Sequence, residues 1–327
     1  MRVSVIVPTY NYAFAICNAI ESVIQQDYPD IELIIIDDGS TDNTDSLVQG
    51  YKSKFENIIY IKQNNKGKAA ATFKGYELST GQILFNLDAD DIFLPGKLRQ
   101  IVKIYESNSS VSMIGHAARI DIDGEVSGIE DLSTKPFVNK ILNGKDLVSI
   151  FLKNNILYGG GSTFSMRKSF VELNEKIAQA DMYIDEYLVY KAAYAGDVMI
   201  LSTPLSVWNI HGSNYSITAK SSARQDKKKQ FRLLKSSEGE LYLLRQFLQE
   251  RVHLTLFRIK HLERASFFYQ KTTNYARWFF SSISILLELL HLLLLGVNII
   301  SIARNYHLAK RFAPPFIYNA FKKNTTD

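Results

Sequence analysis

The chain has 327 residues, of which 46% are hydrophobic and 22% are charged, and its formal net charge is +5 at pH 7. This length and hydrophobic content exclude a disordered chain and suffice for one large core with an appendage, or for two domains. The single cysteine, Cys17, excludes an intramolecular disulfide and a zinc site built from several cysteines.

The charge is distributed unevenly along the chain. Residues 1–215 hold 19 basic and 26 acidic side chains, a net of −7, whereas residues 216–327 hold 19 basic and 7 acidic side chains, a net of +12. A basic C-terminal part favours an anionic partner, either nucleic acid or a phospholipid surface. The first residues enter a strand without a charged leader and a long apolar run, so we expect no secretory signal and a cytoplasmic catalytic part.

Strands and helices are predicted to alternate at short spacing through about residue 118. Continuous apolar runs predict buried strands at residues 3–7, 31–36, 58–61, 83–87 and 111–114. Apolar residues at three- and four-residue intervals predict helices at residues 13–24, at residues 69–78 and after Pro95. This alternation indicates an α/β fold with a mainly parallel sheet flanked by helices, in which ligands bind at the carboxyl ends of the strands.

Three carboxylates, Asp88, Asp90 and Asp91, follow the predicted strand at residues 83–87. In an extended chain, Asp88 and Asp90 point to one side and Asp91 to the other. Two convergent carboxylates suit a hard divalent cation that also holds a diphosphate, although the same pattern is common in solvated turns. A dinucleotide-binding loop is excluded because the first turn, residues 8–12, contains no glycine.

Between residues 119 and 215 the pattern is less regular. It predicts a hairpin turn at residues 121–124, a glycine loop at 159–162, a helix at 183–195 and a short strand at 198–201. We expect this part to complete the site that begins at the strand ends.

The C-terminal part is predicted to be helical, with a basic arm at residues 216–275. Residues 278–303 are the most apolar stretch, and a helix of this length would measure about 39 Å, enough to cross a bilayer. A polar stripe runs along it and consists of Ser281, Ser284, Glu288, His291 and Asn298. The stripe favours a helix lying in the membrane plane, with a spanning helix and a soluble oligomer interface as alternatives.

Three segments carry a resemblance to a known family: VSVIVPTYNYAFAICNAIESVIQQDYPDIELIIIDDGSTDNT, then NKGKAAATFKGYELSTGQILFNLDADD, then LPGKL. Together they resemble the family 2 glycosyltransferases, which have the GT-A (Rossmann-like) fold, over about residues 1–215. The resemblance implies an inverting hexosyl- or N-acetylhexosaminyltransferase that uses a UDP-sugar and Mn²⁺ or Mg²⁺ at a DXD motif.

The resemblance also implies roles for individual residues. It places Asp185 as the catalytic base, with Glu186 as the fallback, in a segment where Ile184 and Lys191 replace the family's acid and arginine. It places His211 in a closing segment in which Trp208-Asn209 replaces the family's Tyr-Arg pair. The implied nucleotide-sugar contacts are Pro8, Thr9, Tyr10, Asp38, Lys68 and Asp88; the implied metal ligands are Asp90, Asp88 and His211; the implied acceptor loop is Gly159, Gly160 and Gly161.

These observations predict a glycosyltransferase domain at residues 1–215, a basic helical arm at 216–275, and an apolar membrane-associated helix with a basic tail at 276–327. We expect a glycan or lipid-linked glycan acceptor in bacterial surface polysaccharide synthesis (capsule, exopolysaccharide or lipopolysaccharide), at the cytoplasmic face of the membrane. The enzyme would be peripheral or monotopic there, with a homo-oligomer as an alternative. Rival interpretations are a sugar-phosphate nucleotidyltransferase and a basic-tailed membrane-binding or nucleic-acid-binding protein, although the apolar helix fits a membrane better than a nucleic acid.

Overall fold

We analysed a computed structural model that describes residues 1–130, 135, 137–154, 160–211, 223–248, 250–271, 274–299 and 302. The chain forms two compact units, which are considered separately. One comprises residues 1–147 with 158–221, and the other comprises residues 148–157 with 222–327.

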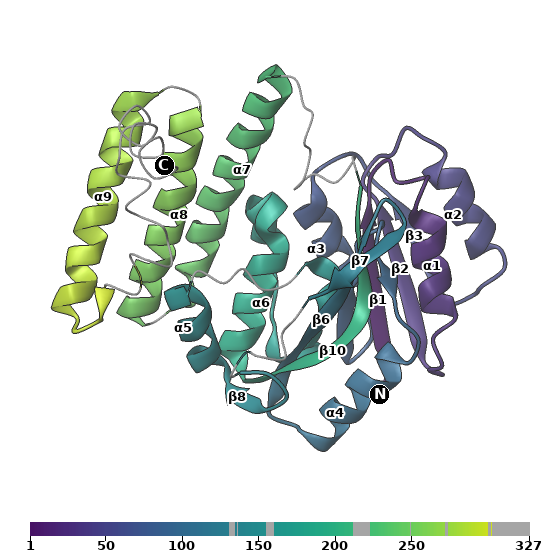
Figure 1. The fold of residues 1–327 in the computed structure, drawn as a ribbon. Helices are drawn as coiled ribbons and strands as arrows, with labels where there is room; N and C mark the ends of the chain where they lie inside the picture. Colours follow the sequence, from purple (N-terminus) through teal and green to yellow (C-terminus); the bar gives the residue numbers. More distant parts are fainter. Residues whose placement is uncertain are drawn as a thin grey trace. The chain divides into compact units, whose positions relative to one another are not determined.

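The first unit begins with alternating strands and helices, as the apolar runs predict (Figure 1). These elements are β1 (Val3–Thr9), α1 (Ile16–Ile24), β2 (Ile31–Asp37), α2 (Thr44–Lys52), β3 (Ile58–Lys62), α3 (Lys68–Leu78) and β4 (Ile83–Asn86). The predicted boundaries agree within three residues, because each strand is mostly apolar and each of these helices is bounded by turn residues.

The second half of this unit adds shorter and less regular elements. They are β5 (Ile92–Phe93), α4 (Lys97–Ser107), β6 (Val111–Ile122), β7 (Glu125–Ile129), β8 (Ile141–Asn143), α5 (Gly144–Asn154), the 3₁₀ turn η1 (Gly161–Thr163), β9 (Phe164–Arg167), the 3₁₀ segments η2 (Lys168–Phe170) and η3 (Glu175–Tyr183), α6 (Ile184–Ala195) and β10 (Asp197–Ile210). The predicted hairpin turn is confirmed between β6 and β7, where Asp123 and Gly124 have φ values of 50° and 89°. The predicted strand at 198–201 is only part of β10.

All strands of this unit belong to one mixed sheet with the order β3-β2-β1-β4-β9-β6-β10-β5, to which β7 and β8 attach through β6 and β10. Strands β3, β2, β1 and β4 are parallel, and β9 is antiparallel to both of its neighbours. The register pairs Thr9 with Asp37 and Ile6 with Asn86. The loops that follow β1, β2 and β4 therefore leave the same edge of the sheet.

Helices cover both faces of this sheet (Figure 1). Alternate side chains of β1 and β2, such as Val5 and Leu33, are fully buried in a cluster with residues of α1 and α4. The opposite side chains of β2, Ile34 and Ile36, pack with Ala71 of α3. Both faces are thus removed from water, which explains why the sequences of these strands are apolar at most positions.

The second unit is helical and contains the part of α5 from residue 148 onward, together with α7 (Ala223–Leu244), α8 (Arg251–Lys271) and α9 (Tyr275–Leu294). The apolar stretch predicted as one helix over 278–303 is interrupted after Leu294. There the N–H of Val297 reaches the carbonyl of Leu292 and Gly296 adopts φ +74°, a helix ending that favours glycine. Within the described residues, Ala276–Leu294 is the one helical stretch long and apolar enough to cross a membrane.

Candidate functional site

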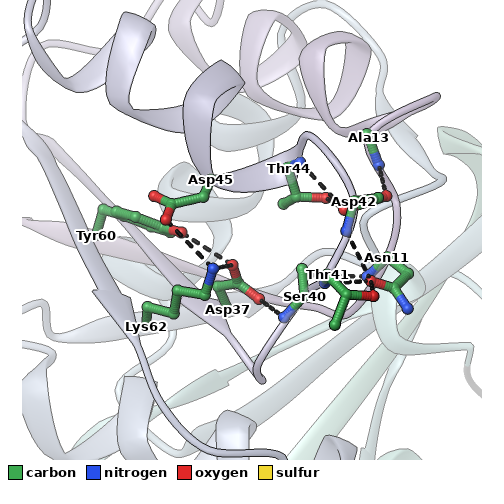
Figure 2. Close-up of polar contacts among 10 residues, drawn as sticks. All are labelled: Asn11, Ala13, Asp37, Ser40, Thr41, Asp42, Thr44, Asp45, Tyr60 and Lys62. Carbon is green, nitrogen blue, oxygen red and sulfur yellow. Dashed lines mark hydrogen bonds and ion pairs between the residues drawn. The ribbon is translucent and has the colours of Figure 1, made fainter.

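The loops after β1 and β2 are tied together by side chains (Figure 2). Figure 2 shows the Asn11 Oδ1 accepting from the N–H of Thr41 at 2.8 Å and of Asp42 at 3.4 Å. The Asp42 carboxylate in return accepts from the N–H of Ala13 at 3.0 Å and of Thr44 at 3.1 Å. These bonds fix the two loops relative to each other and so shape one wall of the site.

The two aspartates at the end of β2 accept hydrogen bonds from different groups. Asp37 is buried and accepts from the N–H of Ser40 and the hydroxyl of Tyr60. Asp38 accepts from the side chain of Gln63 at 2.8 Å, and from the N–H of Lys66 at 2.8 Å and of Gly67 at 2.7 Å. The Asp38 carboxylate therefore shapes the loop before α3, where the family resemblance implies nucleotide contact.

The three other residues implied at the nucleotide lie at the end of β1. Pro8 and Thr9 are its last two residues and pair with Ile36 and Asp37 of β2, and Tyr10 follows with an exposed side chain. The hydroxyl of Thr9 is buried without a hydrogen-bond partner within the described part of the chain. A buried hydroxyl of this kind is available to a ligand that brings its own hydrogen-bonding group.

Lys68, the first residue of α3, joins two carboxylates that come from distant parts of the sequence. Its Nζ lies 2.7 Å from Asp88 Oδ1, after β4, and 2.7 Å from Asp185 Oδ2, at the start of α6. Burial disfavours the charged ammonium, but the carboxylates of Asp185 and Asp88 outweigh it and raise the pKa of Lys68 above its ordinary value. Lys68 is therefore a charged bridge between two elements of the site.

Asp185 is a largely buried carboxylate at the start of α6. One of its oxygens is paired with Lys68, and the other, Oδ1, is buried without a hydrogen-bond partner within the residues described. Burial raises the pKa of Asp185, while Lys68 opposes the rise. Glu186, the fallback, is also buried, on the next position of α6.

Asp90 contacts His211, which follows β10. The His211 Nε2 lies 3.1 Å from Asp90 Oδ2. Burial and the neighbouring carboxylate of Asp88 raise the pKa of Asp90, and His211 opposes this. The imidazole also meets aromatic rings of the first loop, with centroid distances of 5.2 Å to Phe14 and 6.4 Å to Tyr12.

The Asp90 carboxylate supplies an oxygen donor of the kind that Mg²⁺ and Mn²⁺ accept, and the His211 imidazole lies beside it as a second donor. Within the described residues no group of three or more His, Cys, Asp or Glu side chains is close enough to hold a metal by itself. Such a metal is commonly held by one or two protein ligands together with substrate phosphates, so the pair fits this requirement. Asp88 contributes its charge nearby but is engaged with Lys68.

The carboxylates lie in a turn, which corrects the expectation of an extended chain. Strand β4 ends at Asn86, and the N–H of Asp91 donates to the carbonyl of Asp88 at 3.0 Å. In this turn Asp88 meets Lys68, and Asp90 meets His211. Asp91 is buried and accepts from the Ser162 hydroxyl at 2.6 Å, which supports a structural role.

The glycine loop comes close to this turn. A Cβ on Gly161 would lie 2.7 Å from Asp88 Oδ1, so only glycine lets the backbone approach that carboxylate without displacement. Gly160 precedes it, and the Gly160 carbonyl accepts from Thr163. Gly159 and residues 212–214 of the closing segment lie outside the described residues.

Lys97 in α4 contacts Ser162, the residue that bonds to this turn. Its ammonium is fully buried and donates to the Ser162 carbonyl at 2.8 Å and the Ser206 hydroxyl at 2.9 Å. It also lies 3.5 Å from the centroid of the Phe93 ring. Burial holds the pKa of Lys97 well below its usual range, with Asp91 opposing the shift. Lys97 and Asp91 thus anchor Ser162 from two sides.

Replacement of Lys97 by Met should therefore loosen the turn while keeping most of the side-chain volume. We expect the free energy of unfolding to fall by about 1–3 kcal/mol, because a buried hydrogen-bonding group is lost. The displaced turn should weaken nucleotide binding by about 1.4 kcal/mol of binding free energy, which corresponds to a fall in affinity of about tenfold. Thermal unfolding and calorimetric titration with UDP measure the two effects, and unchanged UDP affinity would contradict the role given to Lys97.

Several residues of the site had no role in the sequence interpretation. Ser162 donates to Asp91 and accepts from the N–H of Asp88, while Asn209 donates from its side chain to the carbonyl of Asp90 at 2.6 Å. Two sequence features could have drawn attention to these residues. Lys97 lies in the LPGKL segment, and Asn209 lies where the sequence departs from the family pattern. Their functions depend on contacts across more than 60 residues of sequence, which local patterns do not encode.

Comparison with known proteins agrees with this geometry. An uncharacterized glycosyltransferase of Nostoc sp. is 33% identical over 239 residues, which cover 70% of this chain and 71% of that protein. Matches in Rickettsia are to longer proteins, of which the chain spans about a fifth.

Two solved structures share the fold. The structure of S. aureus TarS residues 1–349 in complex with UDP-GlcNAc has a TM-score of 0.62 and 17% identity, covering 99% of this chain and 92% of that one. The mannosyltransferase PcManGT from Pyrobaculum calidifontis, in complex with GDP-Man and Mn²⁺, has a TM-score of 0.54 and 15% identity, covering 98% and 83%. Residues 4–172 match the family described as Glycosyl transferase family 2, and the chain therefore belongs to that family.

Proposed function

We propose that this glycosyltransferase moves a hexosyl or N-acetylhexosaminyl group from a UDP-sugar to an acceptor hydroxyl with inversion at the anomeric carbon. The observation that carries the proposal is the Lys68 bridge, which links Asp88 at the carboxylate turn to Asp185 on α6. The bridge thereby holds two groups in one site: Asp88, which we place beside the sugar-nucleotide, and Asp185, which we propose as the proton acceptor. A direct displacement requires both groups in one place.

In this mechanism Asp185 accepts the proton of the acceptor hydroxyl on its unpartnered Oδ1. The acceptor oxygen forms a bond to the anomeric carbon from one face. The bond from that carbon to the β-phosphate oxygen breaks on the other face, and UDP leaves with the electron pair. The strand-end residues Pro8, Thr9, Tyr10 and Asp38, with Lys68, would hold the nucleotide, and Gly160 and Gly161 would border the acceptor.

The cofactor of this proposal is Mn²⁺ or Mg²⁺, with Asp90 and His211 as its protein ligands and Asp88 beside them. When bound, the metal would supply positive charge that stabilises the UDP leaving group. The Mn²⁺ in the PcManGT complex supports this assignment, as does the carboxylate oxygen of Asp90.

The UDP-GlcNAc in the TarS complex supports a UDP-sugar as the donor. Because the PcManGT complex holds GDP-Man, a GDP-sugar is the alternative donor that the experiment below tests. The apolar α9 and the basic C-terminal part support an acceptor at the cytoplasmic face of the membrane. We therefore propose a glycan or lipid-linked glycan acceptor in surface polysaccharide synthesis. Family membership favours this activity over nucleotidyl transfer and over nucleic-acid binding.

The proposal is tested by incubating the purified chain with a panel of UDP- and GDP-sugars and Mn²⁺ and measuring the nucleotide released. We expect UDP release that EDTA abolishes and that Asp90→Ala lowers by about 10²-fold or more, because charge stabilisation at the leaving group is lost. Asp27→Ala removes an exposed carboxylate on the same unit and serves as the matched control. Release of pyrophosphate, or undiminished release by Asp90→Ala, would contradict the proposal.

A further inference from the structure

Helix α9 exposes many large apolar side chains and buries Ser281, Ser282 and most of Glu288. Nine large apolar side chains from Phe279 to Leu295 are exposed, with exposed fractions between 36% and 78%, and the side chain of His291 is 44% exposed among them. The apolar ones recur at one- and three-residue intervals and form one continuous face, which we call the α9 face: Phe279, Phe280, Ile283, Leu286, Leu287, Leu290, Leu293, Leu294 and Leu295. A soluble helix shows the opposite arrangement, so this face requires an apolar covering.

Three polar residues of α9 have partners within the protein. The hydroxyls of Ser281 and Ser282 donate to the carbonyls four residues earlier in the same helix. Glu288 pairs with Arg258 of α8 at 3.4 Å, and its own exposure is low. The one acidic residue of the helix is therefore held against α8, while the side chain of His291 stays 44% exposed.

We propose that the α9 face is the surface by which this protein enters an anionic lipid membrane, with α9 lying in the membrane plane. The sequence from residue 216 onward carries a net charge of +12, and Arg277 is exposed at the start of α9. A second copy of the chain would bring the same positive charge to the contact, whereas acidic lipid headgroups complement it.

The neighbouring helix decides between an in-plane and a spanning orientation. In Figure 1, α8 lies between α7 and α9, and the Arg258–Glu288 pair joins α8 to α9. A spanning α9 would carry α8 into the hydrocarbon beside it, and α8 contains six charged residues: Arg251, Arg258, Lys260, Glu263, Arg264 and Lys271. Because charges at the bilayer centre are strongly disfavoured, the packed pair of helices can present only the α9 face to lipid.

The test is co-sedimentation of the full chain with phosphatidylcholine vesicles, with and without phosphatidylglycerol. We expect binding that is stronger to the anionic vesicles and weaker at high salt. The double substitution Leu286→Glu with Leu290→Glu should lower the vesicle partition coefficient by at least about tenfold, because two charges replace inserted leucines. The matched control is Val126→Glu with Ile129→Glu, two exposed apolar positions on β7.

Three results would overturn the inference. The α9 variant could bind vesicles as well as the parent chain does. The parent chain could be a dimer in the absence of lipid that the same variant separates, which would make a second copy the occupant. The protein could stay in membranes after an alkaline carbonate wash, which would indicate a spanning helix. The inference deepens the membrane location proposed above, and since no sugar or acceptor is needed, its failure leaves the glycosyl-transfer proposal intact.

Discussion

Substitution of Asp185 by Asn is expected to lower the turnover of sugar transfer by about 10²- to 10⁴-fold, the usual contribution of a positioned base. The amide keeps an oxygen that can accept from Lys68 but cannot take up the acceptor proton. Affinity for UDP should stay within a few-fold, because Asp185 contacts Lys68 and not the loops after β1 and β2. Single-turnover rates and calorimetric UDP titration separate the two quantities.

Glu186→Gln is the matched control for this experiment, since Glu186 is the adjacent carboxylate on α6 and is the alternative base. The structure favours Asp185 because only that side chain has both the Lys68 contact and a buried, unpartnered oxygen within the described residues. If Glu186→Gln abolished turnover and Asp185→Asn did not, the base would be Glu186. Unchanged turnover in Asp185→Asn would remove the assignment altogether.

Replacement of Lys68 by Met should change both the stability and the pH dependence of the enzyme. It leaves the carboxylates of Asp88 and Asp185 without their shared cation, and these side chains are only 26% and 15% exposed. We expect the free energy of unfolding to fall by about 1–3 kcal/mol, less than for a pair removed wholly from water. Turnover should also fall by about tenfold, because the base is no longer held in place.

The sign of the pH effect follows from the charges around Asp185. Burial raises the pKa of Asp185 and Lys68 lowers it, so loss of Lys68 should move that pKa further upward. Asp185 must be ionised to accept a proton, and activity is lost as the pH falls through its pKa. The acidic limb of the pH–rate profile should therefore shift to higher pH in Lys68→Met.

Lys74→Met is the control for this substitution, because Lys74 lies on the same helix but is exposed and pairs only weakly with Glu77 at 3.4 Å. It should leave the profile and the stability unchanged. A Lys68→Met enzyme with a raised KM for the sugar-nucleotide and an unmoved acidic limb would show that Lys68 serves the nucleotide alone.

Local sequence patterns were sufficient for the first half of the sheet. Strands such as Val3–Thr9 and Ile31–Asp37 are apolar at nearly every position, and this pattern arises only where both faces of a strand are covered. The long strand β10 was underpredicted because polar residues and Pro204 interrupt it. Its pairing with β6 shifts register around Pro204, and such a strand is defined by its partner more than by its own composition.

The polar stripe on α9 is a second feature whose environment the sequence pattern could not predict. The sequence shows that one side of the helix is polar and the other apolar, but it does not tell which side meets the protein. The structure turns Ser281 and Glu288 inward, because Arg258 of α8 supplies a partner for Glu288 that lies 30 residues away. The outward leucines follow from that contact.

The sequence by itself determined the family resemblance, the alternation of strands and helices, and the carboxylates that follow the strand ends, because each depends on residues near one another in the chain. Tertiary structure alone decided the partners of those carboxylates. Lys68 and Asp185 are 117 residues apart, and His211 and Asp90 are 121 apart. Contacts over such separations arise only when the sheet brings its strand ends together, so their charges and pKa shifts are properties of the fold.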